Sequence, residues 1–131
     1  MTFNPQYFFD LATILIKDPN PNYNEEARYR TVISRVYYAA HLISKEKLQE
    51  IGVKFPIEED ETAGIIHELV INAWEPINEN IFDMLKSLRT NRNKADYNLK
   101  WQFKKYGVGL LMDQAKIVID TANQLKKQSN K

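Results

Sequence analysis

The chain has 131 residues, a length that suits one domain with a single hydrophobic core. Its composition is 44% hydrophobic and 27% charged, and the net charge of +1 argues against a protein that binds nucleic acid through bulk charge. The lack of cysteine excludes disulfides, thiolate metal sites and cysteine nucleophiles, and favours a reducing, cytoplasmic location. The N-terminus lacks the pattern of a signal peptide, and the apolar run LATILI is too short to span a membrane.

The first predicted helix covers residues 6–17, QYFFDLATILIK, with Asn4 as its N-cap and Pro5 as its first helical residue. Its large apolar side chains lie nearly all round the helix, which is more than one packing face needs. This excess suggests a second burial surface. The segment DPNPNYN predicts a loop, because proline cannot lie inside a helix and asparagine favours turns. A long second helix is predicted from about Glu25 to about Glu50.

Three more helices are predicted along the rest of the chain. The third is ETAGIIHELVINAW, residues 61–74, and the fourth is IFDMLKSLRTNRNKADY, residues 81–97, after the short connection EPINEN. The fifth is expected from about Trp101 to Lys127, with two glycines near its start that allow a kink or a later beginning. No segment alternates convincingly with period two. The fold class is therefore all-α, an up-and-down bundle of four to five helices in one domain, residues 1–131.

Basic residues concentrate around the end of the fourth predicted helix. From Lys86 to Lys105 there are seven lysines and arginines against one acid, Asp96, so the window carries a net charge of +6. The acidic run EEDE, residues 58–61, offsets part of this charge elsewhere. A solvated charged face is the commoner meaning of such a run, and a local basic patch is the alternative.

Arg92 lies on the apolar side of the fourth helix. Ile81, Leu85 and Leu88 form a stripe at i, i+4 and i+7, and Arg92 is the next position on it. A guanidinium at such a place needs a partner, and Asp96, one turn later, is the nearest. Two interpretations stay open: an ion pair that ties off the helix end, or a polar pocket that presents Arg92 to a phosphate.

Polar side chains follow one side of the second helix. Arg30, Ser34, Tyr37 and His41 lie within roughly 60° of one another, away from the apolar face. They form either an exposed face or a set of partners for the buried end of the fourth helix. His41 is more typical of a structural histidine than of a catalyst, and two histidines without cysteine make a poor metal set. With no glycine-rich phosphate loop, we expect neither a metal nor a cofactor.

Two segments together resemble a known family. SRVYYAAH (34–41), followed by LRTNRNKADY (88–97), resembles the SR-x-YYA-x-x-H helix and the later R-x-x-ADY motif of the small single-domain prokaryotic branch of the HEPN proteins. HELVINAW (67–74) also resembles that branch, and the resemblance covers roughly residues 5–125. It implies a helical bundle that pairs into a homodimer. The matching positions that would support a site are Ser34, Arg35, Tyr37, Tyr38, Asp96 and Tyr97.

The resemblance also implies a range of activities. Many HEPN proteins are metal-independent endoribonucleases that act as toxins beside a nucleotidyltransferase-like antitoxin, or in antiviral defence; others only bind nucleotides or RNA. Active members carry an arginine, four to six residues, then a histidine that can move a proton. Here Asp96 stands in the histidine's place, with Arg89 and Arg92 before it. An aspartate is ionised near neutral pH and repels phosphate, so weak or no cleavage is expected.

Three functions follow as hypotheses. The favoured one is binding of RNA or nucleotide phosphate by Arg89 and Arg92. The second is a non-catalytic protein-interaction module in which Arg92 and Asp96 form a structural pair. The third is an endoribonuclease with His41 and Arg92 as catalytic residues. They differ in whether solvent reaches Arg92, because phosphate binding requires access and a structural pair is expected to be sealed.

Overall fold

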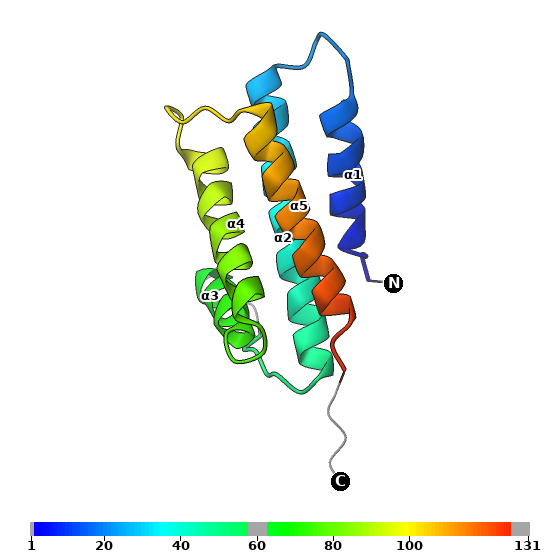
Figure 1. Cartoon of the computed structure of the whole chain (residues 1–131), viewed down its shortest axis with the longest axis vertical. Helices are drawn as coiled ribbons and strands as arrows, with labels where there is room; N and C mark the ends of the chain where they lie inside the picture. Colours follow the sequence, from blue (N-terminus) through cyan, green and yellow to red (C-terminus); the bar gives the residue numbers. More distant parts are fainter. Residues whose placement is uncertain (1, 58–62, 127–131) are drawn as a thin grey trace.

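The computed structural model describes residues 2–57 and 63–126 and contains five helices within them (Figure 1). They are α1 (Gln6–Lys17), α2 (Glu25–Glu50), α3 (Ala63–Trp74), α4 (Glu79–Tyr97) and α5 (Lys105–Asn123). Helices α1, α2, α4 and α5 alternate in direction along the long axis, while the short α3 lies at one end (Figure 1). The described residues contain no strand, so the predicted all-α bundle is confirmed.

Some sequence predictions fall outside the described residues. These are the acidic run at 58–61, the first two residues of the third predicted helix and the last residue of the fifth. Within the part that the structure does describe, no helix is both long and apolar enough to cross a bilayer.

Asparagine side chains accept hydrogen bonds from backbone amides at three helix starts. The predicted starts of α1 and α2 are confirmed, whereas α4 begins at Glu79, two residues before the predicted Ile81. The Asn4 side chain accepts a hydrogen bond from the Gln6 amide at 3.0 Å. Asn24 and Asn78 each accept one from the amide three residues later, at 2.9 and 3.2 Å. Such bonds satisfy amides that have no partner inside the helix. Asn4 was predicted as the N-cap of α1, but Pro5 occupies that position and Asn4 lies one residue before it.

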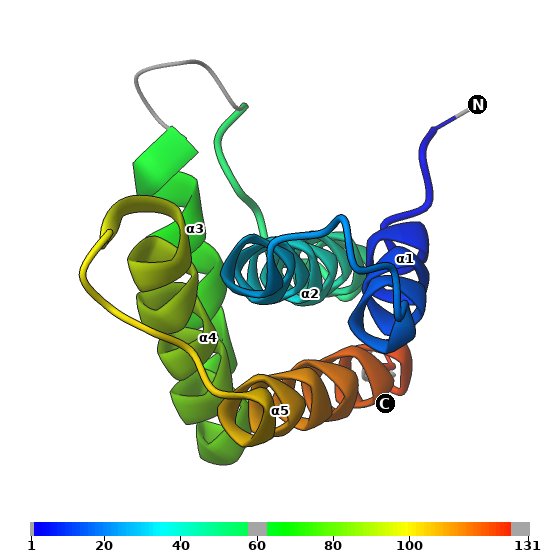
Figure 2. The same cartoon turned by 90° about the horizontal axis from the view of Figure 1, so that it is seen from above.

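Helix α2 is the centre of the bundle and packs against the other four helices. Figure 2 shows α1 and the α3–α4 pair on opposite sides of α2, with α5 along a third side. Its polar stripe is therefore enclosed: Ser34, Tyr37 and His41 are 6%, 0% and 1% exposed. Of the two alternatives left open for this stripe, the exposed face is wrong.

The fifth helix is shorter than its predicted extent. It begins at Lys105 and ends at Asn123, so residues 101–104, where helix was expected, belong instead to the loop 98–104. The reason is tertiary, because side chains of α2 hold the backbone of this loop in a non-helical path, as described below.

Helix α1 leaves much of its apolar surface uncovered. Among its residues only Ala12 is fully buried, and α2 is the one helix against which it packs closely. Tyr7, Leu11 and Ile14, spaced i, i+4 and i+7, are 61%, 52% and 68% exposed. The predicted excess of apolar surface is present as this stripe, while the homodimer that it suggested stays a prediction.

Candidate functional site

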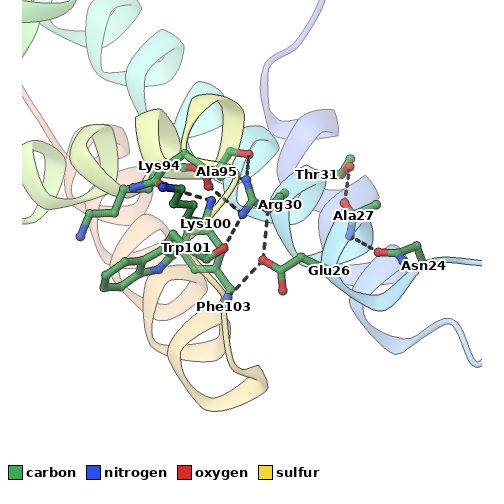
Figure 3. Close-up of polar contacts among 11 residues, drawn as sticks. Asn24, Glu26, Ala27, Arg30, Thr31, Lys94, Ala95, Lys100, Trp101 and Phe103 are labelled. Carbon is green, nitrogen blue, oxygen red and sulfur yellow. Dashed lines mark hydrogen bonds and ion pairs between the residues drawn. The ribbon is translucent and has the colours of Figure 1, made fainter.

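Arg30 of α2 joins the end of α4 to the loop that follows it (Figure 3). Its guanidinium donates to the carbonyls of Ala95 at 3.1 Å and Asn98 at 2.9 Å, and also to that of Trp101. Its Nε pairs with Glu26 at 3.1 Å. Glu26 in turn accepts from the amide of Phe103 at 3.2 Å. We call these contacts the Arg30 network.

The Arg30 network is a structural device. Arginine has five donors in a fixed planar arrangement, and here they serve backbone acceptors and one carboxylate. The carbonyls at the end of α4 have no partners within the helix, and Arg30 supplies them. The interpretation that the α2 stripe provides partners for the end of α4 is thus confirmed for Arg30.

Arg92 of α4 lies at the border between core and solvent. Its Nε is 2.8 Å from Oδ2 of Asp96, and the two side chains are 16% and 29% exposed. The N–H is not well aligned with the carboxylate, so this contact is an ion pair more than a linear hydrogen bond. Arg92 also donates to the Tyr38 hydroxyl at 2.6 Å and to Oδ1 of Asn93 at 3.1 Å. The predicted Arg92–Asp96 pair is confirmed, and it is half-buried without being sealed.

A second arginine, Arg35, also contacts the Tyr38 ring. The Arg35 guanidinium is 5.2 Å from the Tyr38 ring centroid and that of Arg92 is 5.0 Å from it, so both make cation–π contacts with one ring. Arg35 donates to the Ser34 hydroxyl at 3.2 Å. It has no acidic partner among the described residues. An open hollow of about 460 Å³ beside these residues is lined in part by Ser34, Arg35 and Asp96.

Arg89 engages a different helix from Arg92. It donates to the carbonyl of Gly64 at 3.4 Å and lies 3.8 Å from Glu68, both on α3. It lines a groove of about 450 Å³ between α3 and α4, together with Lys86 and Phe82. The expectation that Arg89 and Arg92 act on the same phosphate therefore has no support in their side-chain directions.

Two histidines stack in the core between α2 and α3. The rings of His41 and His67 have centroids 4.0 Å apart and planes 18° apart. The Tyr37 hydroxyl is hydrogen-bonded to Nδ1 of His67, and its ring is stacked with both imidazoles. Sequence reasoning gave His67 little weight and missed this cluster. The available signal was that each histidine lies among apolar residues within a segment that carries the resemblance.

His41 is poorly placed for catalysis. It is 1% exposed, and neither ring nitrogen has a hydrogen-bond partner within the described residues. Burial lowers the pKa of His41 to about 3, and the positive charges of Lys45, Arg89 and Arg92 act in the same direction. Burial also raises the pKa of Tyr37, against the opposing effect of the two arginines. A neutral, enclosed imidazole cannot exchange protons with bound RNA at neutral pH, so this geometry argues against His41 as the base.

Comparisons with protein-family models, curated proteins and solved structures give no match to this chain. Within residues 2–57 and 63–126, no three histidine, aspartate or glutamate side chains come together as a metal site requires. The fold and the site therefore define an all-α bundle with a half-buried arginine pair, Arg35 and Arg92, around Tyr38.

Proposed function

We propose that this chain is a HEPN-like protein that binds RNA or a nucleotide phosphate and has weak or no nuclease activity. The observation that carries the proposal is the pair of arginines around Tyr38. Arg35 lacks an acidic partner in the described part of the chain, and Arg92 is partly open to solvent beside it. Two guanidinium groups from different helices can hold one phosphate through charge-assisted hydrogen bonds.

Weak or absent cleavage follows from the groups around this pair. Asp96 occupies the place where the resemblance expects a proton carrier, and its carboxylate is held in an ion pair with Arg92. His41, the only other candidate that the sequence offered nearby, is enclosed and neutral. Binding without turnover is thus the outcome that the geometry supports best.

The resemblance is the basis for three parts of this proposal: a toxin–antitoxin or antiviral defence system, a nucleotidyltransferase-like partner protein and a homodimer. The exposed apolar stripe of α1 also supports the homodimer, and the lack of cysteine supports a cytoplasmic location.

Metal-free incubation with a mixed RNA pool tests both halves of the proposal. We expect salt-sensitive binding that falls about ten-fold in Arg35→Gln and in Arg92→Gln, with no turnover above the protein-free control. Arg28→Gln, on α2 but away from Tyr38, removes the same charge and is expected to bind like the wild type. Strong cleavage that disappears in both Arg92→Gln and His41→Ala supports the ribonuclease instead. Equal binding by all three arginine variants contradicts the site.

A protein-interaction module is the second candidate, and the exposed apolar stripe of α1 favours it. Tyr7, Leu11 and Ile14 present a surface that would gain from a partner, and a second copy is the occupant that the resemblance suggests. Sedimentation at roughly 10–50 µM is expected to show a dimer for the wild type and a monomer for Leu11→Arg. If the wild type is monomeric and does not bind RNA, a second copy is excluded as the partner of this module, and its partner must be a different protein.

A further inference from the structure

The turn between α4 and α5 presents aromatic and basic side chains together on the surface. Tyr97, Leu99 and Trp101 are 72%, 88% and 43% exposed. Lys94 places its ammonium 4.0 Å from the Trp101 ring centroid, and Lys94, Tyr97, Leu99 and Lys100 help line an open hollow of about 540 Å³. We call these five residues the lysine–aromatic surface. Part of the predicted basic window therefore forms a local patch.

The backbone beneath this surface is fixed. Arg30 donates to the carbonyls of Asn98 and Trp101, and the amide of Lys100 donates to the Asn98 side chain at 3.2 Å (Figure 3). Exposing large apolar side chains to water on an ordered loop does not stabilise the folded protein. Because the loop is already ordered, a ligand bound there loses less affinity to ordering it.

The charge of the surface selects for anions. Neither Lys94 nor Lys100 has an ion-pair partner among the described residues, and the nearby carboxylate, Asp96, pairs with Arg92. The surface is also continuous with the proposed phosphate site, because the Arg92 guanidinium is 5.9 Å from the Tyr97 ring centroid. A chain molecule held at Arg92 can therefore continue over Tyr97 toward the two lysines.

We propose that the lysine–aromatic surface binds single-stranded RNA, with bases stacked on Tyr97 and Trp101 and phosphates paired with Lys94 and Lys100. This inference rests on the proposed function and narrows its ligand from a nucleotide phosphate to a strand of several nucleotides. Stacking suits unpaired bases, since a duplex hides the faces of its bases. Alternating aromatic and basic groups match the alternation of base and phosphate along such a strand, which an acidic protein or an anionic bilayer lacks.

Binding of an oligouridylate of about 12 nucleotides, the scale of a short single-strand site, tests the proposal. Trp101 is a built-in reporter, because the other tryptophan, Trp74, is fully buried. We expect the oligomer to quench Trp101 fluorescence, and uridine monophosphate, a duplex of the same length and anionic phospholipid vesicles to do so far less. Anisotropy of labelled oligomer is expected to show about ten-fold weaker binding for Tyr97→Ala. Tyr23→Ala, which removes a 45% exposed tyrosine from the α1–α2 turn, is the matched control.

The lysines are tested by a pair of double variants with equal charge. Lys94→Gln with Lys100→Gln is expected to reduce the salt slope of binding by about 1.4, since each phosphate contact on a single strand contributes about 0.7. Lys17→Gln with Lys54→Gln is expected to leave the slope nearly unchanged. Melting curves for all variants show that the fold is retained, as these side chains are exposed or half-buried.

The outcomes separate this inference from the proposed function. If Arg92→Gln weakens binding but the surface variants match their controls, the arginine site stands and the lysine–aromatic surface is excluded. If the surface variants weaken binding and Arg92→Gln does not, the surface stands and the arginine site is wrong. Tighter binding of vesicles than of RNA, or equal affinity for the monophosphate and the oligomer, overturns the inference.

Discussion

Helix α2 carries two buried polar sites that differ in how their groups are satisfied. In the Arg30 network the guanidinium and Glu26 serve backbone groups of α4 and of the loop after it. In the histidine cluster, one turn of the chain after Tyr37, both ring nitrogens of His41 lack a partner within the described residues. The first site keeps its charge because every charged group is paired. In the second, burial favours the neutral form of His41 by lowering its pKa.

The difference shows where a ligand can act. A guanidinium that already donates to four backbone carbonyls has little left for a phosphate, and an enclosed neutral imidazole attracts no anion. Between these sites lies the arginine pair around Tyr38, where Arg92 is paired but still partly open. The proposed binding function therefore depends on the half-buried arginines, and the deeper polar groups serve the fold.

The largest expected effect is on the Arg30 network. Arg30→Met keeps much of the side-chain volume but strands Glu26 and the carbonyls at the end of α4. We expect the free energy of unfolding to fall by about 3 kcal/mol, because the carbonyls of Ala95 and Asn98 each lose a charged donor, and a hydrogen bond to a charged group contributes roughly 1.5 kcal/mol. Chemical denaturation measures this loss. Arg28→Met, which removes one carbonyl contact on the same helix, is expected to cost clearly less; equal losses would show that the network adds nothing.

The next effect is the pH dependence of the histidine cluster. The pKa of His41 is about 3 in the folded protein and about 6.5 unfolded, so the unfolded chain binds more protons between these values. Stability is therefore complete above pH 6.5 and falls as the pH drops toward 3, by up to about 1.4 kcal/mol per pH unit. The groups that act on His41 are His67, Lys45, Arg89 and Arg92, and all of them favour its neutral form.

His41→Leu tests this sign directly. The variant is expected to lose most of the slope between pH 6.5 and 4.5, and to match or exceed the wild type at pH 8, because it removes polar nitrogens that have no partner. Denaturant titrations at several pH values measure both. If the slope of the unfolding free energy against pH is unchanged in His41→Leu, His41 is protonated in the folded state. The histidine cluster would then not differ from the Arg30 network in carrying no charge.

Helix positions were predictable because their signals are local. The apolar periodicity and the proline- and asparagine-rich loop between them placed the first two helices at the observed bounds, residues 6–17 and 25–50. The loop was not predicted over residues 101–104, because its conformation depends on Arg30 and Glu26, which lie more than 60 residues earlier in the chain. No local pattern marks a backbone that is held by a distant side chain.

The same division explains the candidate site. The Arg92–Asp96 pair was predictable from its i, i+4 spacing on one helix. The contacts of Arg92 with Tyr38 and of His41 with His67 cross between helices, and they depend on how α2, α3 and α4 pack. Sequence periodicity gives the face on which a residue lies, but it does not give the residue opposite.

The smallest effect on the free energy of unfolding concerns the Arg92–Asp96 pair, which lies between the Arg30 network and the histidine cluster and is partly exposed. Lys116 and Asp120 form a matched control, because they have the same 2.8 Å distance and the same spacing but are 64% and 54% exposed. Asp96→Ala is expected to cost about 1 kcal/mol, against about 0.4 for Asp120→Ala and little more for the exposed Glu79→Ala. A loss of 3 kcal/mol or more for Asp96→Ala, measured by denaturation, would show a pair sealed as in a purely structural role.

The sharper measurement on the Arg92–Asp96 pair is RNA binding by Asp96→Asn. Removing a carboxylate beside the phosphate site is expected to tighten binding by roughly three- to ten-fold, even though the variant is less stable. Unchanged affinity together with lower stability would favour the interaction module, because the pair would then stabilise the fold without facing a phosphate.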